Sequence, residues 1–230
     1  MIIQNNAIFI ADAHYNEKRT DLFTLLSLIK NGEIKTSQLF LMGDIFDFLS
    51  GEIEYFKYIN YKIITLINDL SISHELIYLE GNHDFHLHKI FPNINVISRE
   101  DQPLYVENHK KDIALSHGDI FTPKSYEIFT AIIRNHKFLK FINSMDFGNT
   151  LSKFVEKKLM KKKICHKMNN FLNFVHKRIE KYDTFSKTNL IIEGHYHQGY
   201  ISDRYINIPS LACDNRYMVY QNKQFSFNIL

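Results

Sequence analysis

Side chains that could bind metal recur in five short motifs along the chain. Each motif directly follows a short apolar run that predicts a buried strand. In chain order the motifs are Asp12-Ala13-His14, Gly43-Asp44-Ile45-Phe46-Asp47, Gly81-Asn82-His83-Asp84, His117-Gly118-Asp119 and Gly194-His195-Tyr196-His197. Carboxylate, imidazole and amide-oxygen ligands together suit hard or borderline divalent metals such as Mn, Fe or Zn. The motifs therefore indicate a metal-dependent site without thiolate ligands.

The strength of this signal lies in the set of motifs. An Asp-x-His pair alone is usually a surface feature, Gly-Asp-x-x-Asp alone is usually a turn with a helix cap, and most His-x-His pairs are exposed strand ends. Gly-Asn-His-Asp is more specific, because three consecutive polar groups after a buried strand have no evident structural purpose. All five motifs in this order leave little room for a purely structural explanation.

Alternating strands and helices in the first half of the chain position the first three motifs. Apolar runs at residues 7–11, 38–42 and 75–80 predict strands, and amphipathic stretches at 21–30 and 52–70 predict helices. This order favours a mostly parallel sheet, in which ligands bind beyond the carboxyl ends of the strands. We therefore expect the polar motifs to converge on one edge.

The second half of the chain is richer in strands and contains one long helical block. Strands are predicted at 96–97, 104–107, 112–116, 190–193, 205–208, 217–220 and 225–229. Helical spacing runs from residue 125 to about 182, and neither an internal repeat nor a low-complexity linker interrupts the chain. We predict a single domain, residues 1–230, with a helical insertion at residues 121–187.

The composition bounds the class of protein. The 230 residues are 45% hydrophobic and 23% charged with a net charge of +3, as in soluble globular proteins. We expect no signal peptide, and no apolar run approaches the roughly 20 residues of a spanning helix, so membrane contact is expected to be peripheral. Cys165 and Cys213 form neither a disulfide framework nor a Cys-x-x-Cys motif, so a reducing, cytoplasmic compartment is expected.

The five motifs together resemble the pattern of the calcineurin-like metallophosphoesterase superfamily: D-x-H, G-D-x-x-D, G-N-H-[DE], a later H, and G-H-x-H. The resemblance spans residues 12–197. It implies an α/β (α+β) fold, a four-layer αββα sandwich with a helical cap insertion, and two divalent metal ions, with manganese expected and iron or zinc as alternatives. The implied ligands are Asp12, His14 and His197 for one metal, Asn82, His117 and His195 for the other, and Asp44 as the bridge.

The resemblance also implies a reaction. Two cations about 3.5–4 Å apart stabilise both the attacking and the leaving oxygen of an in-line displacement, so a phosphate or diphosphate ester is hydrolysed by an activated water. His83 is implied to lie beside the phosphate, where an imidazolium can neutralise charge or protonate the leaving group. Asp84 or Asp47 could orient His83 or a ligand histidine, or could be a helix cap only.

The helical block has two interpretations. Its many phenylalanines could pack against the sandwich while its lysines are solvated. Alternatively, the block could cap the metal site, with lysines meeting phosphates and an apolar face receiving acyl chains. Lys158, Lys161 and Lys162 share one face of a helix by i, i+3, i+4 spacing. We predict these three lysines, with Asn82 and His83, as substrate-binding residues.

Length, motif order and the position of the insertion resemble the branch of the superfamily that hydrolyses UDP-2,3-diacylglucosamine in lipid A biosynthesis. The branch implies release of UMP and lipid X (2,3-diacylglucosamine 1-phosphate), a preference for manganese, and peripheral contact with the cytoplasmic face of the inner membrane. Two positions depart from its pattern. His83 stands where the branch has arginine, and Glu127 is the first acidic residue after His117-Gly118-Asp119, later than in the branch.

Two other functions compete with this one. Another phosphoesterase of the superfamily would act on nucleotides, cyclic nucleotides or phosphoproteins. A non-catalytic scaffold would have lost metal ligands, whereas this chain keeps all of them. The modest net charge, without a long basic stripe outside the helical block, argues against a nucleic-acid partner.

Overall fold

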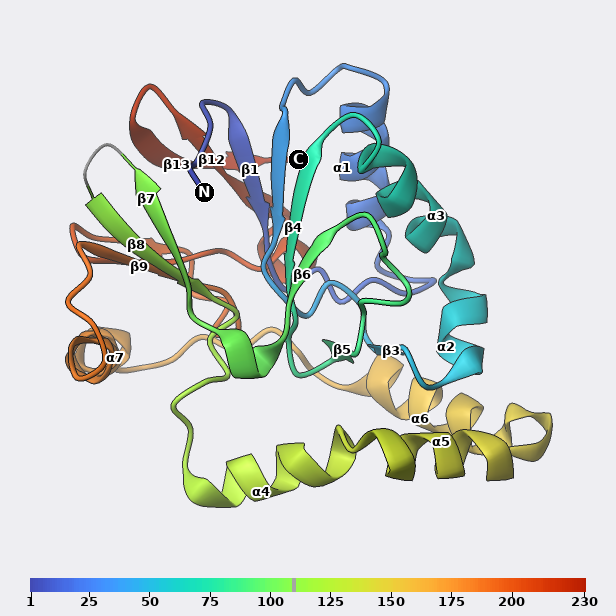
Figure 1. Cartoon of the computed structure of the whole chain (residues 1–230). Helices are drawn as coiled ribbons and strands as arrows, with labels where there is room; N and C mark the ends of the chain where they lie inside the picture. The colour runs from blue at the N-terminus through green and yellow to red at the C-terminus, as the bar shows by residue number, and fades with distance from the viewer. Residues whose placement is uncertain (109–110) are drawn as a thin grey trace.

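Two β-sheets pack face to face and carry helices on their outer sides (Figure 1). The computed structural model describes residues 1–108 and 111–230. The larger sheet has the strand order β13-β12-β1-β2-β4-β6, with β1, β2, β4 and β6 parallel and antiparallel pairing at β1–β12 and β12–β13. Its strands are β1 (Ala7–Ile10), β2 (Gln38–Leu41), β4 (Glu75–Leu79), β6 (Asn95–Ile97), β12 (Arg216–Gln221) and β13 (Gln224–Ile229).

The second sheet has the order β10-β11-β9-β8-β7, with β8, β9 and β11 parallel and β7 and β10 antiparallel at its edges. Its strands are β7 (Leu104–Asn108), β8 (Lys111–Ser116), β9 (Leu190–Glu193), β10 (Tyr200–Ile201) and β11 (Tyr205–Asn207). The short strands β3 (Leu49–Ser50) and β5 (Asp84–Phe85) pair with each other near the third motif. The central strands of both sheets are parallel and are buried on both faces. This explains why the sequences of the strands before the motifs are continuous apolar runs.

The main core lies between the two sheets. Phe9, Phe40 and Ile77 of the larger sheet form one buried cluster with Leu115 and Ile192 of the smaller sheet. The rings of Phe9 and Phe40 stack with their centroids 4.4 Å apart. Alternate residues of the same strands point to the opposite face, as the two-residue period of a strand requires, and there they contact helices.

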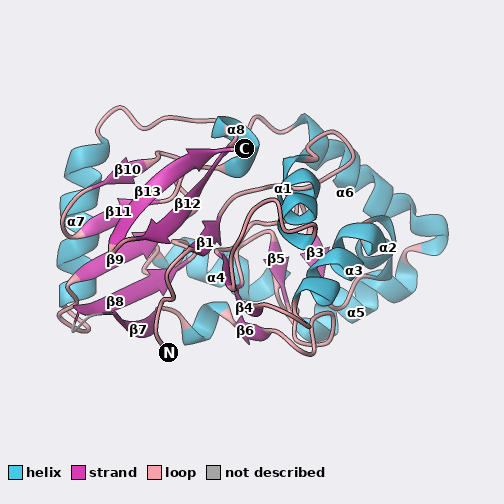
Figure 2. Cartoon of the chain, turned by 90° about the horizontal axis from the view of Figure 1, so that it is seen from above, coloured by secondary structure: helices cyan, strands magenta, loops and turns pink. Residues whose placement is uncertain are grey.

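Helices cover both outer faces and complete four layers. Helices α1 (Asp21–Lys30) and α3 (Tyr61–Leu70) pack on the larger sheet. Helix α7 (Phe171–Asp183) packs on the smaller sheet, where its Val175 and Tyr182 are buried against Ile191. Figure 2 shows α7 beside β9, β10 and β11, on the side of the molecule away from α1 and α3. The predicted αββα sandwich is confirmed.

The predicted helix at 52–70 is two helices, α2 (Glu54–Ile59) and α3. Asn60 leaves helical geometry between them (φ −95°, ψ 7°), and its side-chain amide donates to the carbonyl of Phe56 at 2.9 Å. An asparagine amide that takes a main-chain carbonyl competes with the helical hydrogen bond, which explains the break.

The predicted insertion, residues 121–187, divides into two parts. Helices α4 (Lys124–Ile133), α5 (His136–Met145) and α6 (Thr150–Lys161) lie together beyond the carboxyl edge of the larger sheet (Figure 1), and we name them the cap. Helix α7 returns to the sandwich as its outer layer. Short 3₁₀ turns at Arg99–Asp101 and Phe147–Asn149 and the short helix α8 (Leu211–Asp214) complete the described elements. None of the described helices is long and apolar enough to span a membrane.

A buried ion pair anchors α7 to the smaller sheet. The guanidinium of Arg178 contacts the carboxylate of Glu193 at the end of β9, with Nε 3.1 Å from Oε2. Tyr182 and Tyr205 donate to the same carboxylate at 2.7 and 2.6 Å. Burial alone would raise the pKa of Glu193, but Arg178 and the two hydroxyls hold it below its usual value. The network therefore keeps a fully buried carboxylate ionised directly before the fifth motif.

Replacing Arg178 with alanine should lower the free energy of unfolding by roughly 3–5 kcal/mol, because Glu193 would remain buried without its counter-charge. Arg204→Ala is the matched control, since Arg204 pairs with Asp183 at the exposed end of the same helix and should cost about 1 kcal/mol or less. Urea unfolding of both variants measures the difference. Equal losses would show that the buried pair does not anchor α7.

Candidate metal centre

The five motifs converge at one end of the sandwich. Asp12 follows β1, Asp44 follows β2 and Asn82 follows β4 in the larger sheet, while His117 follows β8 and His195 follows β9 in the smaller one. Their metal-binding atoms gather in groups whose members lie within 4.8 Å of one another. The groups are Asp12, His14 and His197; Asp44, His117 and His195; and His14, Asp44 and His83.

The first two groups coincide with the two sets of ligands that the sequence predicts. Asn82, the remaining predicted ligand, belongs with the second, because its Oδ1 lies 3.3 Å from His117 Nε2. Asp44 is close to both sets, since its carboxylate also groups with His14. The structure therefore brings all seven predicted metal ligands together, with Asp44 between the two sets.

The backbone at these ligands is unusual. Positive φ values occur at Asp12 (50°), His14 (41°), Asp44 (50°), His195 (65°) and His197 (56°). Residues other than glycine rarely adopt this left-handed conformation, which costs on the order of 1–3 kcal/mol each and clusters at active sites. The observed strain indicates that these turns serve function.

Two motif glycines allow the close approach of the strand ends. Gly43 has φ of +85°, and a Cβ there would lie 2.4 Å from His117 Nδ1. A Cβ at Gly81 would lie 2.4 Å from the Asp44 carboxylate. Any larger residue at either position would displace a ligand.

Neighbouring groups orient the ligand side chains. His117 Nδ1 donates to the carbonyl of Met42 at 2.9 Å, which leaves Nε2 as the metal-binding atom. The Asp47 carboxylate lies 3.6 Å from His14 Nδ1. Arg19 binds that carboxylate and also donates to the His14 carbonyl at 2.9 Å. Partners of this kind fix ring orientation at metal sites, and Arg19 is one that the motifs did not reveal.

Asp84 lies behind the ligands rather than among them. Its fully buried carboxylate accepts from the backbone N–H groups of Asp44 and Ile45 at 3.0 and 2.6 Å, and from that of Gly81 at 2.8 Å. The Tyr78 hydroxyl donates to it at 2.7 Å. These contacts shape the turn that carries the bridging ligand, so we expect any role of Asp84 in catalysis to act through positioning.

The charges in the centre suit cations. Burial alone would raise the pKa of Asp44, but His117, His83 and His14 hold it well below its usual range. Burial would likewise raise the pKa of Asp12, and His197 lowers it. Burial and the neighbouring His117 lower the pKa of His195 to about 4. At neutral pH Asp12, Asp44 and His195 are therefore in the forms that bind metal. Burial alone would lower the pKa values of His117 and His197, but Asp44 and Asp12 raise them, so a cation would have to displace a proton from these two imidazoles.

One orphaned atom supports a metal at this site. Asp12 Oδ1 is buried and has no hydrogen-bond partner among the described residues, and it lies 3.3 Å from Nε2 of His197, a member of the same ligand group. Leaving such an atom unpaired is costly, and a bound ion is one of the few explanations for it in a folded protein. The mixed oxygen and nitrogen donors of the seven residues fit divalent cations.

His83 stands between the ligands and the cap. Its Nδ1 donates to the carbonyl of Asp47 at 2.6 Å, and its backbone N–H donates to Asp44 Oδ1 at 2.8 Å. Its free Nε2 lies 3.5 Å from the Nζ of Lys162. Nδ1 is thus occupied without a metal, although the ring also lies in the group with His14 and Asp44. That His83 faces the phosphate stays a prediction.

A groove of about 620 Å³ runs from the metal centre into the cap. Asn82, His83 and Lys162 lie in its lining with many apolar side chains. These come from the cap and the adjacent sandwich: Phe48, Ile53, Phe56, Phe85, Phe129, Ile133, Phe138, Leu139, Ile142, Leu151, Val155 and Leu159. Of the three predicted lysines, Lys162 lines this groove, whereas the Nζ of Lys158 lies over the ring of Phe154 at 5.3 Å and Lys161 is exposed.

Arg134, at the end of α4, fastens the cap to the third motif. Its Nη2 lies 2.8 Å from Glu80 Oε2, and its Nη1 donates to the Gly81 carbonyl at 3.1 Å. The guanidinium also lies 4.9 Å from the centre of the Phe85 ring. Sequence reasoning missed this residue, because nothing local distinguishes a buried arginine from a solvated one on an amphipathic helix.

Glu52, His86 and His136 form a further cluster where α5 meets the sandwich. The two imidazole rings stack with centroids 3.6 Å apart and an angle of 11° between their planes. Ring nitrogens bind metal in the plane of the ring, so nearly parallel rings cannot share one ion. His136 instead contacts Glu52 at 2.7 Å and helps to hold the cap.

The expectation of unpaired cysteines is wrong. Cys165, between α6 and α7, forms a disulfide with Cys213 of α8. The two residues are 48 positions apart, and their Cα atoms are 5.5 Å apart only because the chain returns from the cap across the metal centre. Two isolated cysteines give no sequence signal of such a pairing.

Comparison with known proteins agrees with the geometry. A family model described as calcineurin-like phosphoesterase matches residues 6–199. A relative from Vibrio atlanticus, named UDP-2,3-diacylglucosamine hydrolase, is 21% identical over 216 residues, 90% of this chain and 84% of its own. A relative of the same name from Chromobacterium violaceum is 28% identical over 130 residues, 55% of this chain and 54% of its own.

Other similarities are more limited. A relative from Coxiella burnetii, also named UDP-2,3-diacylglucosamine hydrolase, is 26% identical over 115 residues, 50% of this chain and 47% of its own. The aligned part thus spans about half the length of that relative. A solved structure of a protein of unknown function from Aquifex aeolicus covers 89% of both chains at 16% identity with a TM-score of 0.44.

Replacing Asp44 with alanine should remove bound metal and nearly all turnover, because both ligand groups lose their shared carboxylate. Elemental analysis of metal-exchanged protein and an aryl phosphodiester assay measure the two effects. Asp69→Ala is the control, since Asp69 is an exposed carboxylate that pairs with Lys30. A single essential metal per active chain would contradict the two-metal assignment.

Replacing His83 with alanine should lower kcat by about 10²–10⁴-fold, the usual contribution of a general acid or base. Metal content should stay near that of the unmodified protein, because the seven predicted ligands remain and His83 Nδ1 donates to the Asp47 carbonyl. His88→Ala, in an exposed position of the same segment, should leave kcat unchanged. Full activity of the His83 variant would remove its assigned role.

Proposed function

The chain belongs to the calcineurin-like phosphoesterase family, and from this premise we propose that it hydrolyses the diphosphate of UDP-2,3-diacylglucosamine, releasing UMP and lipid X. That the protein is a metal-dependent phosphoester hydrolase follows from the family and from the ligand groups. The observation that carries the finer proposal is the groove, which joins an apolar cap to the metal centre. The names of the relatives from Vibrio atlanticus and Chromobacterium violaceum support the same substrate class.

The groove has a polar part and an apolar part, as the substrate has a polar head group and apolar acyl chains. Asn82, His83 and Lys162 offer polar contacts where a diphosphate or sugar would lie, and the remaining lining is almost entirely apolar. Each methylene group that leaves water for such a lining contributes about 0.8 kcal/mol. Two acyl chains would therefore dominate recognition. A phosphoesterase of nucleotides, cyclic nucleotides or phosphoproteins, the alternative function, would have no use for this surface.

The ligands would hold two divalent cations, with Asp12, His14 and His197 at one, Asn82, His117 and His195 at the other, and Asp44 between them. When bound, the cations activate a water molecule and stabilise both the attacking and the leaving oxygen. The oxygen and nitrogen donors suit manganese, iron or zinc. We propose manganese because of the resemblance to the branch that hydrolyses UDP-2,3-diacylglucosamine.

The chain's own residues supply positioning and proton transfer. The Asp47 carbonyl fixes the imidazole of His83 through Nδ1, so that Nε2 faces the groove and can hold a proton near the leaving oxygen. Lys162, 3.5 Å from that nitrogen, adds positive charge where the diphosphate would lie. The cap, held by Arg134, provides much of the apolar lining of the groove beside these residues.

We also propose that the cap makes peripheral contact with a membrane surface. Several large apolar side chains of the cap are exposed, including Phe141, Met145, Phe147 and Phe154. Exposed apolar groups that lie beside lysines suit the surface of an anionic bilayer. Such contact would bring the acyl chains of the substrate to the mouth of the groove.

The enzyme should cleave UDP-2,3-diacylglucosamine far faster than UDP-N-acetylglucosamine at equal concentration, because only the first substrate fills the apolar groove. Release of UMP, followed by chromatography, measures both rates. Equal rates would mean that acyl chains are not recognised, and the function would then be that of a general nucleotide phosphoesterase.

Replacing Phe129 of the groove with aspartate should lower kcat/KM for the diacylated substrate by about 10–100-fold, because an acyl chain would lose its apolar contact with this ring and meet a charge instead. Hydrolysis of a small aryl phosphodiester should not change, because the metal ligands are intact. Ile128→Asp is the matched control, since Ile128 is exposed on the same helix outside the groove lining. Equal effects of the two variants would contradict the assignment of the groove.

A further inference from the structure

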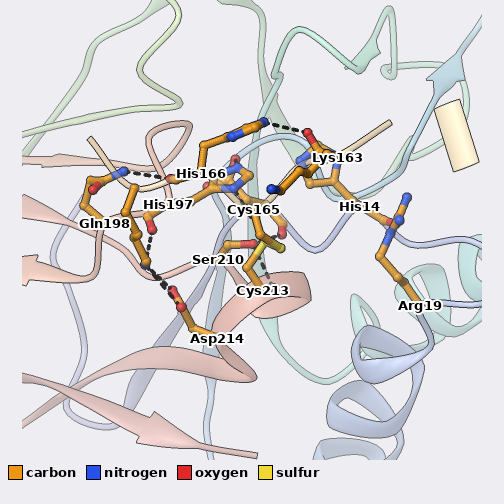
Figure 3. Close-up of a disulfide and its surroundings, with 12 residues drawn as sticks. His14, Arg19, Lys163, Cys165, His166, His197, Gln198, Ser210, Cys213 and Asp214 are labelled. Carbon is orange, nitrogen blue, oxygen red and sulfur yellow. Dashed lines mark hydrogen bonds and ion pairs between the residues drawn. A yellow bond between two sulfur atoms is a disulfide. The ribbon is translucent and has the colours of Figure 1, made fainter. Parts of the chain in front are cut away.

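The segment between α6 and α7 crosses the metal centre on its way from the cap to the sandwich. We name residues 162–168 the strap. The strap begins at Lys162, which ends α6 with an extended backbone (φ −65°, ψ 129°). Its middle carries Cys165, which is bonded to Cys213 (Figure 3). Cys213 lies beside a metal ligand, with its Sγ 3.8 Å from His197 Nδ1.

Little besides the disulfide holds the strap in place. No strap residue is buried, and Ile164 alone is half-buried. Polar contacts join its second half to the fifth motif and to α8. The Nζ of Lys167 donates to the His197 carbonyl at 2.5 Å and lies 3.1 Å from Asp214. The Gln198 amide donates to the His166 carbonyl at 3.2 Å (Figure 3). Exposed contacts of this kind contribute little on their own.

The first residue of the strap contacts the predicted catalytic histidine. Lys162 Nζ lies 3.5 Å from His83 Nε2, and Lys162 is three residues from Cys165. Three residues of extended chain span about 10 Å at most, so fixing Cys165 restricts where Lys162 can reach. On its N-terminal side Lys162 is joined to α6. That helix is in turn fixed to α2, because the Tyr55 hydroxyl of α2 donates to Glu156 of α6 at 2.6 Å.

We propose that the Cys165–Cys213 disulfide is a positioning cross-link of the active site, which keeps Lys162 beside His83, and that its reduction slows the cleavage of the diphosphate substrate. The proposal rests on the proposed function for the substrate in its assay. Lys162 is the positioned group, and the cysteines act through it without touching the substrate.

Reduction would proceed by thiol–disulfide exchange with a dithiol. One thiolate of the dithiol attacks a sulfur of the pair, which forms a mixed disulfide and releases the other cysteine as a thiol. The second thiol of the reagent then displaces the first cysteine. Two electrons pass to the protein, which gains two thiols, and the reagent leaves as a cyclic disulfide.

The kinetic test compares oxidised and dithiothreitol-reduced enzyme in excess Mn²⁺, together with Cys165→Ser. Peptide mapping without reductant first verifies the bond in the oxidised sample. Reduction should lower kcat/KM for UDP-2,3-diacylglucosamine by about 10–100-fold, the loss of one contact to a charged group. Cys165→Ser should match the reduced enzyme and should not respond to dithiothreitol. Unchanged kcat/KM on reduction would overturn the proposal.

Lys162→Ala separates positioning from a general structural role. If the cross-link acts through Lys162, this variant should be slow in both redox states and show no further loss on reduction. Lys157→Ala, an exposed lysine of the same helix, should keep the full redox response. A Lys162→Ala enzyme that still loses activity on reduction would contradict the assigned route.

Trypsin provides a readout that needs no substrate. Lys162, Lys163 and Lys167 are cleavage sites within the strap, and their cleavage rate should rise about tenfold or more when the cross-link opens, because proteolysis follows the population of the open segment. If neither redox form cleaves the diacylated substrate, the proposed function fails. Equal trypsin rates in both forms would overturn the cross-link proposal independently of that result.

Discussion

The carboxylate of Asp44 is the group on which the rest of the site depends. It is buried and ionised, so its desolvation must be offset by nearby positive charge and by hydrogen bonds. The backbone N–H of His83 supplies one such bond, and Asp84 holds the turn from behind through the N–H groups of Asp44 and Ile45. Position 81 requires glycine, because a side chain there would overlap with this carboxylate.

A single sheet could not build this centre. Asp12, Asp44 and Asn82 extend from the larger sheet, whereas His117 and His195 extend from the smaller one, so their distance is set by the packing between the sheets. Phe9, Phe40 and Leu115 in that interface are therefore part of the support of the site. Strained turns at the strand ends then aim the ligands at one point, and the well-packed core below them stabilises that strain.

The sandwich and the convergence of the seven candidate ligands could be predicted because their signals are local: a buried strand, a turn and polar residues within a few positions. The parts that were missed depend on distant segments. Arg134 contacts Gly81, which lies 53 positions away, and Cys165 pairs with Cys213 across 48 positions. Helix α7 resembled the cap helices in its apolar content, and only its contact with Ile191 and Tyr205 distinguishes it as the outer layer of the sandwich. Composition carries no record of such partners.

The lysines show why helical spacing alone could not name the residue beside the metal centre. The i, i+3, i+4 rule places Lys158, Lys161 and Lys162 on one face only while the helix continues. Helix α6 ends at Lys161, and the extended backbone of Lys162 turns that side chain toward His83. Lys158 stays on the helix and lies over Phe154. The end of a helix thus places one lysine at the boundary between a general hydrolytic centre and the cap, where a substrate's phosphate would meet its specificity-determining part.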